Sequence, residues 1–258
     1  MNRYLSAIGL YARWNLYPVL VIILVTVLAA GIMTYRVPIG EAAVNMGPDP
    51  ETGEAMQALT IYGNLEGVAA RGGAPIVCAA GFVAITAVMS LTGCGYGVKA
   101  DYTVRRLRVK EPRAMFLWAA YHAALLAFYW AALAAVMYGV MTCRLGLDVP
   151  TDYHYGPQSM MLLFYTDAFL HHLLPLQDAA VWGADIASVL AVALSSVAFS
   201  CRQRQGKFSI LVLVAAAAAI LNFFQEVGSN VIFVLMALQL AVAGGAAGTI
   251  MRGGSDET

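Results

Sequence analysis

Residues 95–115 read GYGVKADYTVRRLRVKEPRAM and lie between two long stretches that carry almost no charge. This segment holds six of the 15 Lys and Arg residues of the chain, namely Lys99, Arg105, Arg106, Arg108, Lys110 and Arg113. Such a concentration of positive charge beside apolar stretches is typical of a connection on the cytoplasmic side of a membrane protein. The segment therefore indicates the direction in which the stretches on either side of it cross the membrane.

The composition predicts a polytopic membrane protein. Apolar residues make up 60% of the 258 residues, charged residues only 12%, and the mean hydropathy is +0.71. Several apolar runs reach about eighteen residues, which is the length needed to cross a hydrocarbon core of about 30 Å. The formal net charge of zero says nothing about partners, because the position of each charge matters more than the sum.

We expect an all-α fold with one membrane domain over residues 17–250 and a cytoplasmic tail at 251–258. Six apolar stretches are predicted to cross, at residues 17–35, 74–92, 114–142, 179–199, 208–224 and 229–250. A seventh stretch, 157–176, contains Asp167, His171 and His172, which are unfavourable on a lipid-facing helix.

The distribution of basic residues decides whether residues 157–176 cross. If they do not, and the N-terminus is cytoplasmic, 12 of the 15 basic residues lie inside and three lie outside, namely Arg36, Arg71 and Arg144. If they do cross, the division is eight inside and seven outside. The first arrangement follows the positive-inside rule. It predicts cytoplasmic termini and an interfacial or re-entrant helix on the outer face.

The first sixteen residues, MNRYLSAIGLYARWNL, have the pattern of a surface helix. Leu5, Ile8, Ala12 and Leu16 recur at helical spacing, and the basic residues fall elsewhere on the wheel. We expect residues 1–16 to lie in the inner headgroup layer as an amphipathic helix that contacts lipid and turns into the first span near Pro18.

Three groups of residues are candidates for special roles. His122 lies well inside the third predicted span, where it is either a proton site or a satisfied packing residue. Asp167 and His171, four positions apart, share one face of a helix and form either a proton-sensitive pair or the wet side of an interfacial helix. Gly244 and Gly248 form a GxxxG motif, which allows close packing of helices within the chain or with a second copy.

The sequence offers no catalytic or cofactor motif. It lacks HExxH, GxSxG and the GxxxxGK[ST] phosphate loop, and its cysteines and histidines do not have metal-ligand spacing. We therefore expect no enzyme activity, no metal and no cofactor in this chain, and no nucleic-acid partner.

Three short strings resemble the permease subunit of a bacterial type-2 ABC exporter: DYTVRRL followed by a proline, FLHHLLPL, and FSCRQRQGKF. The resemblance implies a separate cytoplasmic ATPase chain that binds ATP and Mg²⁺, a second permease copy or a related permease, and a location in the bacterial inner membrane. It assigns contact with the ATPase to a coupling helix that carries Tyr102, Arg105, Arg106 and Arg108. The cargo it implies is hydrophobic or amphipathic, such as a peptide, a lipid or a drug.

Two other functions remain open at this point. The chain could be a non-transporting membrane subunit that scaffolds or regulates a larger complex. It could also be a proton-coupled secondary transporter that uses His122, or Asp167 with His171. An ATPase that binds the chain and is stimulated by it separates the first hypothesis from both of these.

Overall fold

The structure, a computed structural model, describes residues 2–37, 43–48, 55–59, 67–92, 111–148, 157–176, 178–224 and 228–253. The long helices of the bundle are α1 (Asn2–Arg36), α4 (Ala74–Thr92), α6 (Glu111–Asp148), α9 (Ala179–Arg204), α10 (Leu211–Phe224) and α11 (Ser229–Gly253). Three short helices accompany them: α3 (Val68–Arg71), α7 (Pro157–Thr166) and α8 (Ala168–Leu173).

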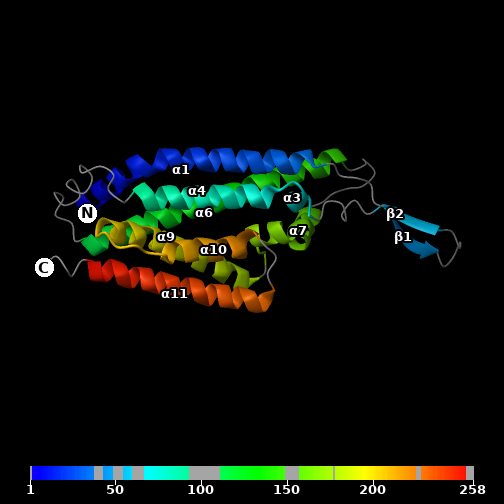
Figure 1. The fold of residues 1–258 in the computed structure, drawn as a ribbon. Coiled ribbons are helices and arrows are strands. Elements are labelled where there is room, and N and C mark those ends of the chain that lie inside the picture. The colour runs from blue at the N-terminus through cyan, green and yellow to red at the C-terminus, as the bar shows by residue number, and fades with distance from the viewer. Residues whose placement is uncertain are drawn as a thin grey trace.

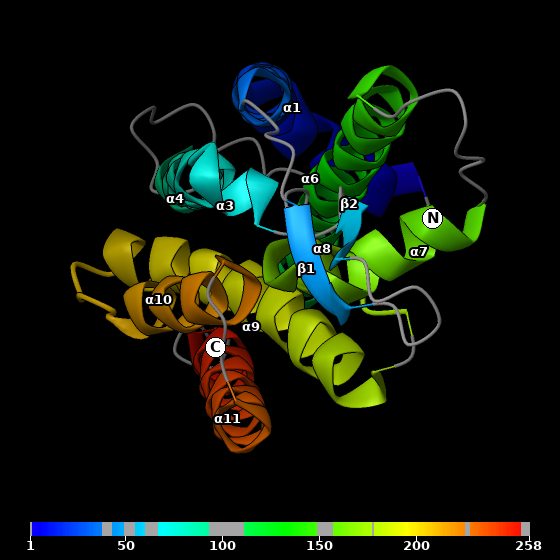
Figure 2. The same ribbon diagram turned by 90° about the vertical axis from the view of Figure 1, so that its right-hand side faces the viewer.

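The long helices form two layers. Figures 1 and 2 show α1, α4 and α6 on one side of the bundle and α9, α10 and α11 on the other. Helix α9 packs against α4, α6, α10 and α11, whereas α1 packs against α4 and α6. Both chain termini lie at one end, and α3 and α7 lie at the opposite end (Figure 1). The bundle therefore has a terminal end and a capped end.

Five of the described helices are long and apolar enough to cross a membrane: Asn15–Arg36, Ala74–Thr92, Glu111–Arg144, Ala179–Arg204 and Asn230–Arg252. These helices confirm the expected helical, multi-pass membrane architecture. The predicted span 208–224 contains α10, which has 14 residues and a length of about 21 Å. The total of six crossings thus stays a prediction, and it depends on α10.

Helix α1 continues through Pro18 as one helix of 35 residues. Figures 1 and 2 show its first turns leaving the axis of the rest of the helix at the terminal end. Just before Pro18, Asn15 is buried, hydrogen-bonded to Thr92 of α4 and close to His122 of α6. The position of residues 1–16 in the headgroup layer stays a prediction.

Local signals in the chain set several helix ends. Pro112 occupies the first turn of α6, where a missing backbone N–H costs nothing. At the end of α9, Gly206 has φ +70° and Lys207 donates its backbone N–H to the carbonyl of Arg202 at 2.9 Å. A left-handed glycine of this kind ends a helix and redirects the chain, here toward α10.

Residues 157–176 form α7 and α8, which meet at Asp167. The helices have 10 and 6 residues, or about 15 and 9 Å, so neither is long enough to cross a membrane. Helix α8 packs against α6 and α10 (Figure 2). The stretch therefore lies at the capped end of the bundle, as a broken helix.

The sequence analysis did not anticipate a β-hairpin before α3. Strands β1 (Ala43–Pro48) and β2 (Ala55–Leu59) pair antiparallel, with Ala43 opposite Leu59 and an irregular register between Asn45 and Pro48. The hairpin lies beyond the capped end (Figure 1).

Small residues bring α1 close to its neighbours. Gly81 of α4 faces Thr26 of α1, and Gly31 of α1 faces Val136 of α6. The GxxxG motif behaves differently, because a Cβ added at Gly244 or Gly248 would meet no atom within 4 Å. Close packing among the described residues therefore does not use this motif, and its contact with a second copy stays a prediction.

Replacing Gly81 by alanine should weaken the α1–α4 contact. The added Cβ would lie 2.8 Å from the Cβ of Thr26, so the helices must move apart. We expect a loss of about 1–3 kcal/mol in the free energy of unfolding, measured by thermal unfolding in detergent. Gly139→Ala is the control, since no atom lies within 4 Å of that site. Equal stability of Gly81→Ala and the control would contradict the close approach.

Candidate functional site

Helix α9 carries a stripe of polar side chains on its buried face. Asp185, Ser188, Ser195, Ser196 and Ser200 are each at most 1% exposed, and their spacing places them along one side of the helix. The stripe extends over residues 185–200, which corresponds to a rise of about 22 Å along the helix axis. Because polar groups inside an apolar bundle are costly and concentrate at functional sites, this stripe is the candidate site.

His122 of α6 joins the part of the stripe nearer the terminal end to two other helices. Its ring is fully buried, with Nε2 lying 3.3 Å from Asn15 Nδ2 of α1 and Nδ1 lying 2.8 Å from Ser196 Oγ of α9. Asn15 Oδ1 in turn accepts a hydrogen bond from the hydroxyl of Thr92 of α4 at 2.6 Å. Side chains from four helices therefore form one hydrogen-bonded chain across the bundle.

The geometry around His122 defines a neutral ring. Asn15 Nδ2 is a donor, so Nε2 accepts and the ring proton lies on Nδ1, directed at Ser196 Oγ. Ser196 can then donate its own proton to the carbonyl of Ala193 at 2.9 Å. The sequence singled out His122 but offered two roles for it, and this network supports a satisfied polar residue at a helix crossing.

Asp185 lies at the other end of the stripe, near the capped end. Its Oδ1 accepts a hydrogen bond from Nδ2 of Asn222 on α10 at 2.7 Å, and both side chains are fully buried. The sequence analysis did not select Asp185. An acidic residue six positions into an apolar stretch resembles a residue at the polar flank of a span. Its hydrogen-bond partner, Asn222, lies 37 positions away in the sequence, so local pattern does not reveal the pair.

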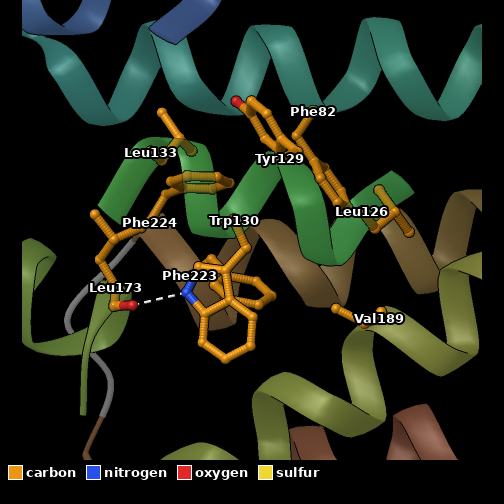
Figure 3. A pocket seen from close by; sticks show the side chains of 9 residues that line it. All are labelled: Phe82, Leu126, Tyr129, Trp130, Leu133, Leu173, Val189, Phe223 and Phe224. Carbon is orange, nitrogen blue, oxygen red and sulfur yellow. Dashed lines mark hydrogen bonds between the residues drawn. The ribbon is translucent and has the colours of Figure 1, made fainter. Parts of the chain in front are cut away.

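An apolar cavity lies beside the stripe. Figure 3 shows its lining, contributed by α4, α6, α9, α10 and the end of α8: Phe82, Leu126, Tyr129, Trp130, Leu133, Leu173, Val189, Phe223 and Phe224. Its free volume of about 20 Å³ accommodates one water-sized molecule. The polar atoms of two aromatic residues are already bonded, Trp130 Nε1 to Leu173 O and Tyr129 OH to Cys78 O, each at 2.7 Å. The space thus offers apolar surface to a ligand.

Asp167 links the short helices α3 and α8 at the capped end of the bundle. Its side chain is 1% exposed, and its two oxygens accept hydrogen bonds from the backbone N–H groups of Gly67 at 2.9 Å and Leu170 at 3.0 Å. The first bond fixes the start of α3, and the second caps the start of α8. Asp167 therefore connects the segment before α4 to the segment before α9.

The two adjacent histidines of α8 have different surroundings. His171 is half-buried beside the ring of Tyr165, with 5.6 Å between ring centroids. His172 is buried, and burial lowers its pKa below the usual 6.5; the neighbouring His171 lowers it further, while Asp178 acts in the opposite direction. The predicted pair of Asp167 and His171 is joined through its backbone, with His171 N donating to Asp167 O at 2.8 Å.

The predicted coupling residues, Tyr102, Arg105, Arg106 and Arg108, lie outside the described residues. Within the described part of the chain, no group of three or more His, Cys, Asp or Glu residues is placed to hold a metal ion. Comparison of the chain with protein families, curated proteins and solved structures finds no match.

Replacing His122 by alanine should destabilise the bundle. The change leaves Asn15 and Ser196 without their ring partner and opens a cavity, so we expect a loss of about 2–4 kcal/mol in unfolding free energy. His171→Ala, at a half-buried site, should cost less than about 1 kcal/mol. Thermal unfolding in detergent compares the two variants, and equal losses would contradict the structural role of His122.

His172 should make the protein less stable in acid. The unfolded chain takes up a proton near pH 6.5, whereas the buried ring resists protonation, so stability falls as the pH drops below 6.5. We expect His172→Gln to reduce this fall in a series of melting temperatures from pH 7 to about pH 5. His171→Gln should retain a fall, since His172 stays buried. An unchanged acid dependence in His172→Gln would contradict this assignment.

Proposed function

We propose that the chain is the permease subunit of an ATP-driven type-2 ABC exporter in the bacterial inner membrane, with the terminal end of the bundle in the cytoplasm. The observation that carries this proposal is the distribution of charge along the helix order. With an even number of crossings, 12 of the 15 basic residues belong to the terminal end or to connections that begin and end there. This distribution supports a cytoplasmic terminal end and a docking surface for an acidic partner.

The basic connection between α4 and α6 is the proposed contact with the ATPase. Arg105 and Arg106 would form charge-assisted hydrogen bonds with carboxylates of the partner, and Tyr102 and Arg108 would extend the contact. The partner would supply the ATP-binding site and Mg²⁺, since the chain has no phosphate loop.

Packing at the start of α6 could transmit a movement of this connection to α9 and α11. Buried residues of α6 in its first turns, Met115, Trp118 and Ala119, form one apolar cluster with Val197 and Ala198 of α9 and Ala246 and Ile250 of α11. Helices α6 and α9 share the His122–Ser196 hydrogen bond next to this cluster. Displacement of the connection by a partner would therefore move α6 together with α9 and α11.

The apolar cavity supports a hydrophobic or amphipathic cargo, such as a lipid, a drug or a peptide. Its lining exposes aromatic and aliphatic side chains, which bind apolar groups without a fixed charge. At about 20 Å³ the cavity is far smaller than such a cargo. Transport would therefore require the two layers to separate, or a pathway formed with a second permease copy.

The first test is purification of the tagged chain from its native membrane in mild detergent, followed by mass spectrometry. We expect a stoichiometric chain with a phosphate loop and an ATPase activity that the permease stimulates. The double substitution Arg105→Glu, Arg106→Glu should reduce copurification and stimulated ATP hydrolysis roughly tenfold or more, because charge-assisted bonds worth about 1.5–3 kcal/mol each are lost.

A matched control reverses the charge of two other basic residues expected at the same end, Arg13 and Lys207, both of which are exposed. The Arg13→Glu, Lys207→Glu chain should retain its ATPase partner. If no nucleotide-binding chain copurifies with the unmodified protein, the exporter assignment is wrong and the scaffold function gains support. If both double variants lose the partner equally, net charge rather than residues 105–106 determines docking.

A further inference from the structure

Asp185 lies inside a membrane-spanning helix and is fully buried. It is six residues, or about 9 Å, from the first residue of α9. Apolar side chains surround this part of α9, where Val181 and Ala184 pack against Ile232 of α11. An ionised carboxylate in such surroundings is costly unless a positive charge or several hydrogen bonds compensate it.

The hydrogen bonds around Asp185 are incomplete. Asn222 supplies one bond to Oδ1, while Oδ2 has no hydrogen-bond partner among the described residues. Two further buried oxygens nearby in the fold also lack partners there, Oδ1 of Asn222 and Oγ of Ser188, which lies one turn along the same face of α9. Three oxygens thus remain unpaired around one carboxyl group.

Among the described residues of the helices packed on α9, no fixed positive charge is available to Asp185. Helices α4 and α10, and α11 up to Arg252, contain no Lys, Arg or His. The basic groups of α6 are engaged or exposed elsewhere: Arg144 bonds to the backbone of Tyr35, Arg113 is exposed, and His122 belongs to the network with Ser196. The other titratable side chains that these neighbours bury are Cys78 of α4 and Tyr129 of α6, neither of which carries a positive charge. Tyr129 OH donates to the backbone carbonyl of Cys78.

We propose that Asp185, held by Asn222, is a reversible proton-binding site within the membrane domain. One proton binds to Oδ2, which converts the carboxylate into a neutral carboxylic acid and turns an unpaired acceptor into a donor. The proton stays bound while α9 and α10 remain packed, because release would leave an uncompensated charge in apolar surroundings. Separation of α9 from α10 would admit water and allow release.

The test uses the purified full chain in detergent, without any partner, so it does not depend on the proposed exporter function. Melting temperatures are measured from acid to alkaline pH in choline chloride. We expect an alkaline fall, in which stability drops by about 3 °C per pH unit as the pH rises above about 4, because Asp185 ionises in the unfolded chain but keeps its proton in the folded chain. Asp185→Asn, which mimics the neutral acid and can still accept from Asn222, should remove this alkaline fall.

Infrared spectroscopy gives a second, direct measurement. The carbonyl stretch of a protonated carboxylic acid is distinct from the bands of a carboxylate. We expect this band at neutral pH in the unmodified chain and its loss in Asp185→Asn. Asp178→Asn is the matched control, since Asp178 is exposed at the start of the same helix. That variant should keep both the band and the alkaline fall.

Asn222→Ala provides an independent test that does not alter Asp185. Removing the donor to Oδ1 should extend the alkaline fall to a higher pH, because the ionised form loses its one described hydrogen bond and the folded chain keeps the proton longer. Absence of the acid band at neutral pH, or an alkaline fall that persists in Asp185→Asn, would overturn the proposal. If sodium chloride in place of choline chloride removes the fall, the site binds sodium, and the proposal of a proton is wrong.

Discussion

Helix α9 buries polar side chains among apolar helices, where each of them needs a hydrogen-bond partner from the protein. The positions of the neighbouring helices follow from this requirement. In lipid, apolar surface gains little from meeting apolar surface on another helix, so position must be set by close contact and by hydrogen bonds. Helix α6 supplies His122 to Ser196, and α10 supplies Asn222 to Asp185. Helix α4 supplies the carbonyl of Ser90 to the hydroxyl of Ser200 at 2.7 Å. Hydrogen bonds to α9 therefore fix the positions of α4, α6 and α10, which apolar packing alone would not specify.

The two halves of the bundle are closed in different ways. The half nearer the terminal end is closed by polar side chains that bond to one another around His122. The half nearer the capped end is closed by aromatic rings and by side-chain bonds to backbone groups, where Trp130 bonds to the last residue of α8 and Asp167 joins α3 to α8.

Much of this fold could be predicted from single stretches of sequence. Apolar runs located the helices, since length and hydropathy are local properties. Residues 157–176, set apart because of Asp167 and the histidines, form two short helices. Helix α1 continues through Pro18 although proline disfavours a helix interior, and the tertiary contacts of Asn15 with α4 and α6 could not be read from the local sequence. The β-hairpin was missed because its short strands carry no strong alternating pattern.

The candidate site was harder to predict, because its pairs are tertiary. His122 could be selected as a polar residue within a span, but Asn15 and Ser196 are 107 and 74 positions away. Asp185 near the start of a span resembled a flanking acid until its contact with Asn222 showed it to be enclosed. For Gly244 and Gly248, spacing indicated a shared face but not the direction in which that face points.

The short length of α10 has a consequence for the surrounding bilayer. A crossing by a helix of about 21 Å would leave about 9 Å of a typical 30 Å hydrocarbon core without a matching helical surface. Lipid beside α10 would have to shorten its chains, or the exposed apolar side chains of Phe208 and Ile210 would have to cover the difference. Either adjustment costs a fraction of a kcal/mol for each ångström. The face of α10 would then be a thinned strip of membrane next to the aromatic cavity, where the barrier to a lipid-soluble molecule is lowest.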